Sequence, residues 1–160
     1  MRLQGVKESL VSQSFAYFDL PDSCEFSVRK AININTCSKR DLNKLGIRKS
    51  LVNRIINFRK ALGGYHTLVQ LKDVYGIKET EYKKLEGCLS LNEINLRKIF
   101  INRVSYFELR KHPYISNKIA SRIVNYRTKI GRFKSKSNLT KVHDLSEITL
   151  EKIAPYLSFE

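Results

Sequence analysis

The chain has 160 residues and a hydrophobic content of 42%, which suffices for one domain or two small ones and excludes wholesale disorder. Thirty Lys and Arg residues against fifteen Asp and Glu residues give a net charge of +15. This balance favours a polyanionic partner, either nucleic acid or an anionic surface, and the alternative is a basic surface that only keeps the protein soluble.

The first thirty residues show little periodicity. Phe15 and Tyr17 alternate with smaller residues, as in a short strand or an extended arm, and the pattern stops at Pro21. We interpret residues 1–30 as an N-terminal arm or as the tail of a preceding unit, and we assign them no function.

From Ala31 onward the chain repeats itself. The pattern of residues 32–44 returns 67 positions later, and the pattern from residue 47 onward returns 68 positions later with eleven identities. The sequence therefore predicts two duplicated units, residues 31–93 and 94–160. They carry twelve cations against six acids and fourteen against five, so the basic character belongs to both units.

Each unit is predicted to begin with a short helix that carries its own N-terminal cap. Ser38 precedes Asp41 by three positions, and Ser105 precedes Glu108 in the same way, which is the spacing of a capping box. In a capping box the Ser and acidic side chains each accept a backbone amide hydrogen, so we expect a helix to start after each Ser.

The second helix of each unit is predicted over residues 49–61 and 117–129. Apolar residues three and four positions apart form a stripe along both segments, as in a helix that packs one face against a core. Gly63 and Gly131 follow these helices, and we expect each Gly to form a left-handed C-cap.

A third helix is expected from Thr67 to near Val74, with a weaker twin from Ser135. A turn with Gly between apolar neighbours follows and leads to a helix that ends near Leu85. The same kind of turn opens the second helix, so the chain has four such turns. They read Gly46-Ile47-Arg48, Gly76-Ile77-Lys78, Tyr114-Ile115-Ser116 and Asp144-Leu145-Ser146.

These motifs carry a family resemblance. The segments Ile32-Asn33-Ile34-Asn35-Thr36, Leu45–Arg59, Gly63-Gly64-Tyr65 and Gln70–Ile77 resemble a ComEA-type helix-hairpin-helix domain. The second copy, with His112-Pro113-Tyr114-Ile115, resembles divergent tandem copies found in bacterial proteins of this class. The resemblance covers about residues 31–159.

The resemblance implies an all-α fold of tandem double helix-hairpin-helix domains, each with four to five short helices, behind the N-terminal arm. It also implies sequence-independent binding of DNA, most simply double-stranded, in DNA uptake or repair. A monovalent cation held by hairpin carbonyls is a further family property, and we expect no other cofactor.

The turns depart from the family pattern, in which apolar residues alternate with two glycines. The second Gly is absent from all four turns, and the first Gly remains only at Gly46 and Gly76. A side chain at these positions can keep a phosphate backbone away, and Asp144 would repel it. The alternative function is therefore a protein-interaction scaffold that keeps the fold and binds a protein partner.

The candidate DNA-binding residues follow from helix N-termini, whose free amides and positive dipole suit a phosphate. In the first unit they lie in its two turns, with structural turns and solvated cations as the alternative. In the second unit they are one helix start and a basic loop, which could follow a DNA backbone by charge alone. The set is Gly46, Ile47, Arg48, Lys49, Ser50, Gly76, Lys78, Ser116, Asn117, Lys118, Arg132, Lys134 and Lys136.

Other repeated or prominent side chains have structural interpretations. Arg54 and Arg59 recur as Arg122 and Arg127, and such pairs could serve the fold by bonding carbonyls at helix ends. Tyr114 at a turn could stack on a base or a sugar, or could pack against the protein.

The sequence argues against an enzyme, because its acids are scattered and no nucleophile has a paired base. Cys24, Cys37 and Cys88 are odd in number and widely spaced, which argues against a disulfide framework or a metal site. No stretch is apolar enough to insert into a membrane. We expect a cytoplasmic protein if Met1 is the natural start, and a periplasmic or surface protein if an export signal was removed.

Overall fold

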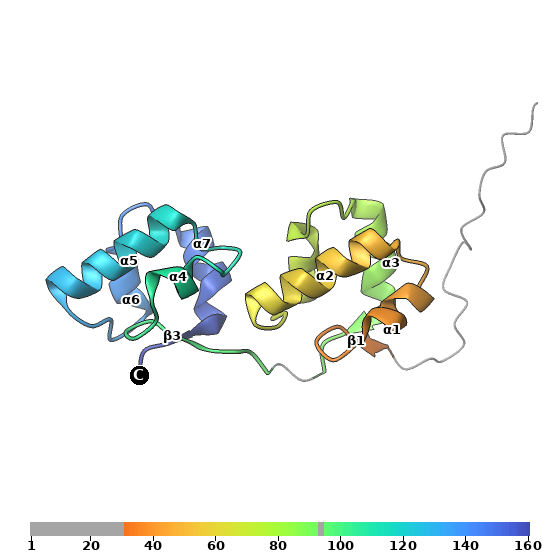
Figure 1. The fold of residues 1–160 in the computed structure, drawn as a ribbon, viewed down its shortest axis with the longest axis horizontal. Helices are drawn as coiled ribbons and strands as arrows, with labels where there is room; N and C mark the ends of the chain where they lie inside the picture. Colours follow the sequence, from red (N-terminus) through yellow and green to blue (C-terminus); the bar gives the residue numbers. More distant parts are fainter. Residues whose placement is uncertain (1–30, 93–94) are drawn as a thin grey trace, which may run out of the picture.

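A computed structural model describes residues 31–92 and 95–160, and the arm predicted over residues 1–30 lies outside these described residues. Figure 1 shows the two described ranges as two groups of short helices that lie side by side. Strands contribute only two residues each. The predicted all-α architecture is therefore confirmed.

The first unit runs from a short strand through four helical segments to a second strand. In chain order the elements are β1 (Ile32–Asn33), α1 (Lys39–Lys44), α2 (Lys49–Leu62), the 3₁₀ helix η1 (Leu68–Asp73), α3 (Glu79–Cys88) and β2 (Leu89–Ser90).

The second unit has the same order, with one more 3₁₀ turn before its last strand. Its elements are β3 (Ile99–Phe100), α4 (Tyr106–Leu109), α5 (Asn117–Ile130), α6 (Lys136–Leu139), α7 (Glu147–Ile153), η2 (Ala154–Tyr156) and β4 (Leu157–Ser158).

The first helix of each unit starts where its capping box predicted. The Ser38 hydroxyl accepts from the Asp41 amide at 3.2 Å, and the Asp41 carboxylate accepts from the Ser38 amide at 2.9 Å. Ser105 and Glu108 form the same reciprocal bonds at the start of α4. These bonds satisfy amides that no helical carbonyl can reach, so they determine where each helix begins.

The glycines after the two long helices behave differently. Gly63 has φ 84° and ψ 22°, which is the predicted left-handed C-cap. Gly131 has φ 110° and ψ −169°, so the prediction of a left-handed C-cap was wrong there. In the first unit the amides of Gly63 and Gly64 both donate to the Arg59 carbonyl. At the matching place in the second unit Arg132 follows Gly131, and of these two residues only Gly131 donates its amide to the Arg127 carbonyl.

Short parallel strand pairs, which the helical interpretation did not include, join the two ends of each unit. Ile32 pairs with Leu89 in the first unit, and Ile99 pairs with Leu157 in the second. Each pair brings the start of a unit to its end, so each unit closes on itself around its own core.

Each core is built from the apolar stripes that the repeat predicted. Leu42, Ile55 and Leu71 are fully buried in the first unit, as are their counterparts in the second unit. Those counterparts are Leu109, Ile123 and Leu139. Across the described ranges, no helix is both long enough and apolar enough to cross a membrane.

Arg59 and Arg127 confirm their structural interpretation. Arg59 Nη1 donates to the carbonyls of Ile34 and Cys37, both at 2.8 Å. Arg127 Nη1 donates in the same way, at 3.0 and 3.1 Å, to the carbonyls of Ile101 and Val104. Each Arg therefore ties its long helix to the turn before the first helix of its unit.

A polar seam joins the two units. We use this name for the contacts of Gln70 and Asp73 with Tyr114, Lys152 and Tyr156. Tyr156 is fully buried within the core of the first unit, and its hydroxyl lies 3.0 Å from Gln70 Nε2. Lys152 Nζ and the Tyr114 hydroxyl both donate to the Asp73 carboxylate. Side chains of the second unit thus complete the first, which connects the two units through side chains as well as through the chain.

Candidate nucleic-acid interface

The four turns have a common local structure. Residues 45–48, 75–78, 113–116 and 143–146 form the first to fourth turns, and they lead directly into α2, α3, α5 and α7. In the second, third and fourth turns, the backbone amide of the third turn residue donates a hydrogen bond to the carbonyl of the residue just before the turn. Each turn therefore presents the start of a helix, where amides lack helical partners.

The first turn offers the most open helix start. Gly46 has φ 74°, a conformation that residues with a Cβ rarely adopt, and nothing lies within 4 Å of the place where a Cβ would be. Helix α2 begins without a side-chain cap and without an acid in its first turn. The amides of Lys49 and Ser50 have no hydrogen-bond partner in the described parts of the chain. An anion could approach these amides from solvent.

The second turn lies against the first. Arg48 Nη2, at the start of α2, forms an ion pair with Glu81 Oε1 at 3.2 Å, and Glu81 belongs to the first turn of α3. The two candidate turns of the first unit are therefore neighbours. The second turn is less suited to binding a phosphate, because Glu79 and Glu81 place two negative charges beside the cation Lys78.

Arg54 braces the second turn from the side of α2. Its Nη1 donates to the Tyr75 carbonyl at 3.2 Å, and its guanidinium lies 5.0 Å from the centre of the Tyr75 ring. Gly76 has φ 91°, and a Cβ placed there would lie 2.5 Å from Arg54 Nη1. Because Gly76 has no side chain, the guanidinium of Arg54 can lie directly beside the second turn.

In the third turn, Tyr114 contacts the seam, whereas Ser116 at the end of the turn is exposed. Pro113 and Tyr114 replace the Gly, and the Tyr114 hydroxyl donates to Asp73 at 2.7 Å while its ring packs edge-on against Phe58. These contacts favour packing over the predicted stacking on a base. Ser116 caps α5 by accepting from the Ile119 amide, and the neighbouring Asn117 and Lys118 are exposed.

The fourth turn contains the least expected geometry. Asp144 has φ 66°, so it adopts the left-handed conformation that Gly76 adopts in the first unit. Its carboxylate is held by three groups: Lys118 Nζ at 3.1 Å, Arg122 Nε at 2.6 Å and His143 Nδ1 at 3.1 Å. The hydrogen bond from Lys118 is the main reason why the pKa of Asp144 lies below its usual range. Asp144 was expected to repel phosphate, and here it also neutralises neighbouring cations.

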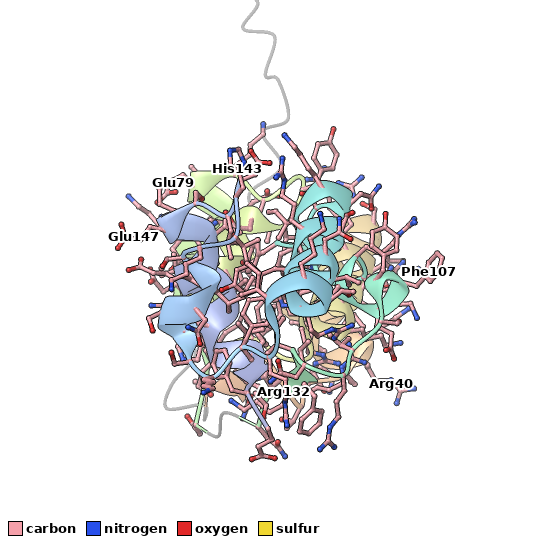
Figure 2. All side chains as sticks on the ribbon, turned by 90° about the vertical axis from the view of Figure 1, so that its left-hand side faces the viewer. Arg40, Glu79, Phe107, Arg132, His143 and Glu147 are labelled. Atoms are coloured by element: carbon pink, nitrogen blue, oxygen red, sulfur yellow. The ribbon has the colours of Figure 1, made fainter. Side chains whose placement is uncertain are left out.

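The basic loop of the second unit lies away from these turns. Arg132, Lys134 and Lys136 are exposed, and they follow the C-terminal end of α5, whereas Lys118 lies at its start. A helix of 14 residues spans about 20 Å, so the loop and Lys118 lie at opposite ends. Figure 2 shows Arg132 at the opposite edge of the second unit from His143. The structure therefore does not bring these candidates to one helix end.

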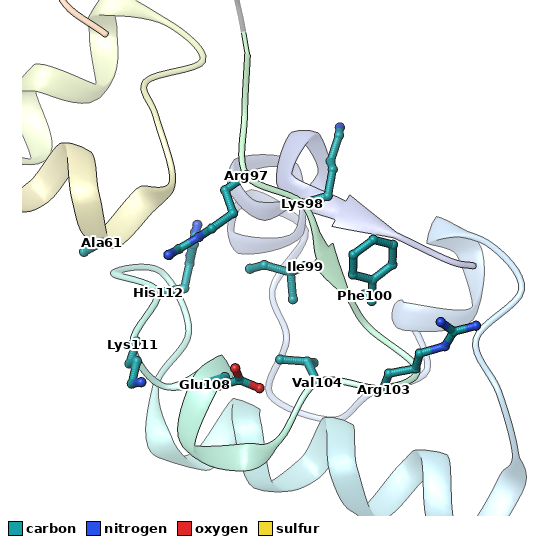
Figure 3. Close-up of a pocket in the computed structure, with 10 residues that line it drawn as sticks. All are labelled: Ala61, Arg97, Lys98, Ile99, Phe100, Arg103, Val104, Glu108, Lys111 and His112. Atoms are coloured by element: carbon teal, nitrogen blue, oxygen red, sulfur yellow. The ribbon is translucent and has the colours of Figure 1, made fainter. Parts of the chain in front are cut away.

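A cavity of about 360 Å³ lies where the two units approach each other (Figure 3). Arg97, Lys111 and Ala61 line it together with His112, which is buried and whose two ring nitrogens have no hydrogen-bond partner among the described residues. Burial, helped by the charge of Arg97, lowers the pKa of His112 to about 4. His112 is therefore a neutral core residue at physiological pH.

The arrangement of Arg54, Arg122 and Asp144 could not be found from local patterns alone. The duplication did identify Arg54 and Arg122 as equivalent, and it aligned Gly76 with Asp144. The repeat therefore contained a clue to the ion pair: the second unit has an acid, Asp144, where the first has Gly76, and both units have an Arg at the position of Arg54 and Arg122. Within the described residues, no group of three or more His, Cys, Asp or Glu side chains is placed to hold a metal ion.

Known proteins match this chain in two tandem segments. The family described as "Helix-hairpin-helix motif" matches residues 27–90 and again residues 94–158. A protein of Danio rerio named "Endonuclease/exonuclease/phosphatase family domain-containing protein 1" is 29% identical over 154 residues. The proteins of the same name from Xenopus laevis and Homo sapiens are 25% and 24% identical.

These vertebrate matches cover 82% of this chain and 28% to 29% of the relatives. The chain thus spans little more than a quarter of their length. No solved structure matches it.

Proposed function

Since this chain belongs to the helix-hairpin-helix family, we propose that it binds DNA independently of sequence, through helix-start amides and flanking cations that contact phosphates. The observation that carries the proposal is the start of α2. There the uncapped amides of Lys49 and Ser50 face solvent beside the side chain of Lys49 and that of Arg48, which also pairs with Glu81 of α3. Amides, dipole and charge coincide at this one place.

The first unit is the main contact surface in this proposal. Its two turns are neighbours, and both keep the glycine that lets a backbone come close. The second unit offers Ser116 and Asn117 at its exposed helix start, where Lys118 is paired with Asp144. The basic loop with Arg132 acts separately, as a source of attraction that does not depend on turn geometry.

We also propose the kind of DNA that the chain binds and the role that this binding serves. Phosphate contacts alone suit double-stranded DNA of any sequence, and a role in uptake or repair would use such binding. The likeness to ComEA-type bacterial copies remains a prediction, since the relatives reported above are vertebrate proteins. We also propose that this chain acts as a binding module and not as a catalyst, although those relatives are named for an endonuclease/exonuclease/phosphatase domain.

A pair of matched double variants tests the proposal. Arg48→Gln with Lys49→Gln removes two cations at the start of α2, and Lys83→Gln with Lys84→Gln removes two exposed cations farther along α3. Binding of a short labelled duplex is measured by fluorescence anisotropy at several salt concentrations. We expect the first variant to bind more weakly and to reduce the slope of log K against log salt by about two.

The control decides between a local site and diffuse charge. Both double variants change the net charge equally, so an equal loss of affinity would show that the start of α2 has no special role. If the unmodified chain bound neither double- nor single-stranded DNA at low salt, the proposed function would be wrong.

A protein-interaction scaffold is the second candidate, and the fourth turn favours it. There Asp144 already occupies the position beside Lys118 and Arg122, and Tyr114 of the third turn is committed to the seam. Capture of the same protein partner from a host extract before and after nuclease treatment would support the scaffold. Loss of every partner with nuclease would support DNA binding.

A further inference from the structure

The carboxylate of Asp144 sits where three donors of the second unit converge. Lys118 Nζ and Arg122 Nε reach the same oxygen, Oδ2, from successive turns of α5, while His143 Nδ1 reaches Oδ1. The Arg122 Nε atom is buried, and its contact with Asp144 is not aligned as a hydrogen bond. The carboxylate thus fills an anion position without fully satisfying the donors around it.

The first unit shows the same position without an internal anion. Gly76 replaces Asp144, Arg54 replaces Arg122 and Ser50 replaces Lys118. Arg54 is exposed, and within the described residues it forms no ion pair but donates to the Tyr75 carbonyl. Among the described residues, this position therefore holds one cation without an ion pair in the first unit, and two cations that Asp144 neutralises in the second.

We propose that Lys118 and Arg122 form a phosphate-binding site of the second unit, which Asp144 occupies in the free protein and thereby closes to DNA. This inference rests on the proposed DNA binding, and it adds Arg122 and Asp144 to that function. Asp144 determines how many phosphates the protein contacts and directs binding toward the first unit. A second-unit site appears when the carboxylate is removed or displaced.

The geometry allows a phosphate to replace the carboxylate. The side chain of Lys118 is 67% exposed and that of Arg122 is 36% exposed, so Lys118 and the part of Arg122 beyond its buried Nε can be reached from solvent. Exposed ion pairs are weak, but a carboxylate that the fourth turn holds beside α5 competes at a high effective concentration. A phosphate must therefore displace the carboxylate before it can bind these two cations.

Asp144→Asn tests the proposal, with Glu147→Gln as the control. Asn tolerates the left-handed backbone conformation, so the first variant should keep the turn. Glu147 is an exposed acid at the start of α7 and forms no ion pair within the described residues. Each variant raises the net charge by one, so the comparison separates a local effect from overall charge.

The measurement is anisotropy with a short labelled duplex over a range of salt, together with circular dichroism to verify folding. For Asp144→Asn we expect a Kd about three- to tenfold lower at low salt and a steeper salt slope by about one to two. For Glu147→Gln we expect a smaller change with an unaltered slope. Equal effects of the two variants on a chain that binds DNA would overturn this inference and leave the proposed function intact.

A double-mutant cycle adds a second readout. Lys118→Ala should weaken binding little in the unmodified chain, because Asp144 already occupies that cation. In the Asp144→Asn background the same change should remove most of the gain. Additive effects of the two changes would contradict the proposal, and if none of the variants bound DNA, both this inference and the proposed function would fall.

Discussion

At the scale of single residues, neighbouring groups change what a side chain can do. His112 is 3% exposed and packs edge-on against Tyr156 at 4.9 Å between ring centres. Its ring nitrogens lack hydrogen-bond partners among the described residues, so the charged form would be poorly stabilised there. Arg97 adds repulsion, and the pKa of His112 falls to about 4 from the ordinary 6.5.

His112 should make folding stability depend on pH. Between pH 6.5 and about 4 the unfolded chain binds a proton that the folded chain does not, so stability falls as the pH is lowered through this window. We expect His112 to account for a loss of about 2 kcal/mol in the free energy of unfolding between about pH 7 and pH 5. Urea unfolding at the two pH values measures it.

His112→Phe should remove this part of the pH dependence, whatever it does to stability at neutral pH. His66→Gln is the matched control, because it deletes a His outside the core. Should His112→Phe keep the pH dependence of the unmodified chain, another group would be responsible.

At the scale of elements, the turns depend on residues that tolerate a positive φ. Gly46 and Gly76 supply this conformation in the first unit, and Asp144 supplies it in the second. The third turn reaches the same helix start with Pro113 and Tyr114, and the segment from Lys111 to Ile115 is one residue longer than the segment from Lys44 to Ile47. Two backbone solutions therefore place a helix N-terminus at the same point of the duplicated unit.

Ala substitution at two glycines separates backbone strain from packing. At both Gly46 and Gly87 the place that a Cβ would take has no atom within 4 Å, but only Gly46 has a positive φ, whereas Gly87 lies within α3. We expect Gly46→Ala to lower the free energy of unfolding by about 1–2 kcal/mol. Gly87→Ala should raise it by up to about 1 kcal/mol, because Ala favours a helix.

Chemical denaturation of both variants measures these changes. The opposite signs are the critical result, since both substitutions add one methyl group in open space. If Gly46→Ala were as stable as the unmodified chain, the left-handed conformation of the first turn would not be required by the fold.

At the scale of the whole molecule, the seam makes the two units depend on each other. Tyr156 belongs to the second unit but lies in the core of the first, where its hydroxyl donates to the Gly64 carbonyl at 2.9 Å. Gln70 and Asp73 complete the connection through Tyr156 and Lys152. The seam should hold the four turns in one arrangement, and the two units should unfold in a single transition.

Tyr156→Phe should show the contribution of the seam. The change keeps the ring but removes the hydroxyl that bonds the Gly64 carbonyl and Gln70 Nε2, which we expect to cost about 1–3 kcal/mol. Tyr75→Phe removes a hydroxyl from a side chain that is 83% exposed and should stay within about 0.5 kcal/mol of the unmodified chain. Equal stabilities of the two variants in urea would argue against an energetic role for the seam.

The sequence by itself determined the duplication, the helix starts and most helix ends. These features depend on residues a few positions apart, such as Ser38 with Asp41, or on the backbone freedom of one residue, such as Gly63. Gly131 shows the limit of such local inference, because its conformation also depends on the path of the following chain. The short strand pairs were missed because two residues are too few to show a period.

The tertiary structure decided which charges act together. Lys118 and Arg132 both belong to the predicted basic surface, but α5 separates them, whereas Asp144 meets Lys118 and Arg122 from 22 or more positions away. Hydrogen bonds and direct ion pairs form between groups that lie a few ångströms apart in space, whatever their distance along the chain. Periodicity and capping therefore predict the helices, but only packing shows which cations are free to bind a phosphate and which the chain has already neutralised.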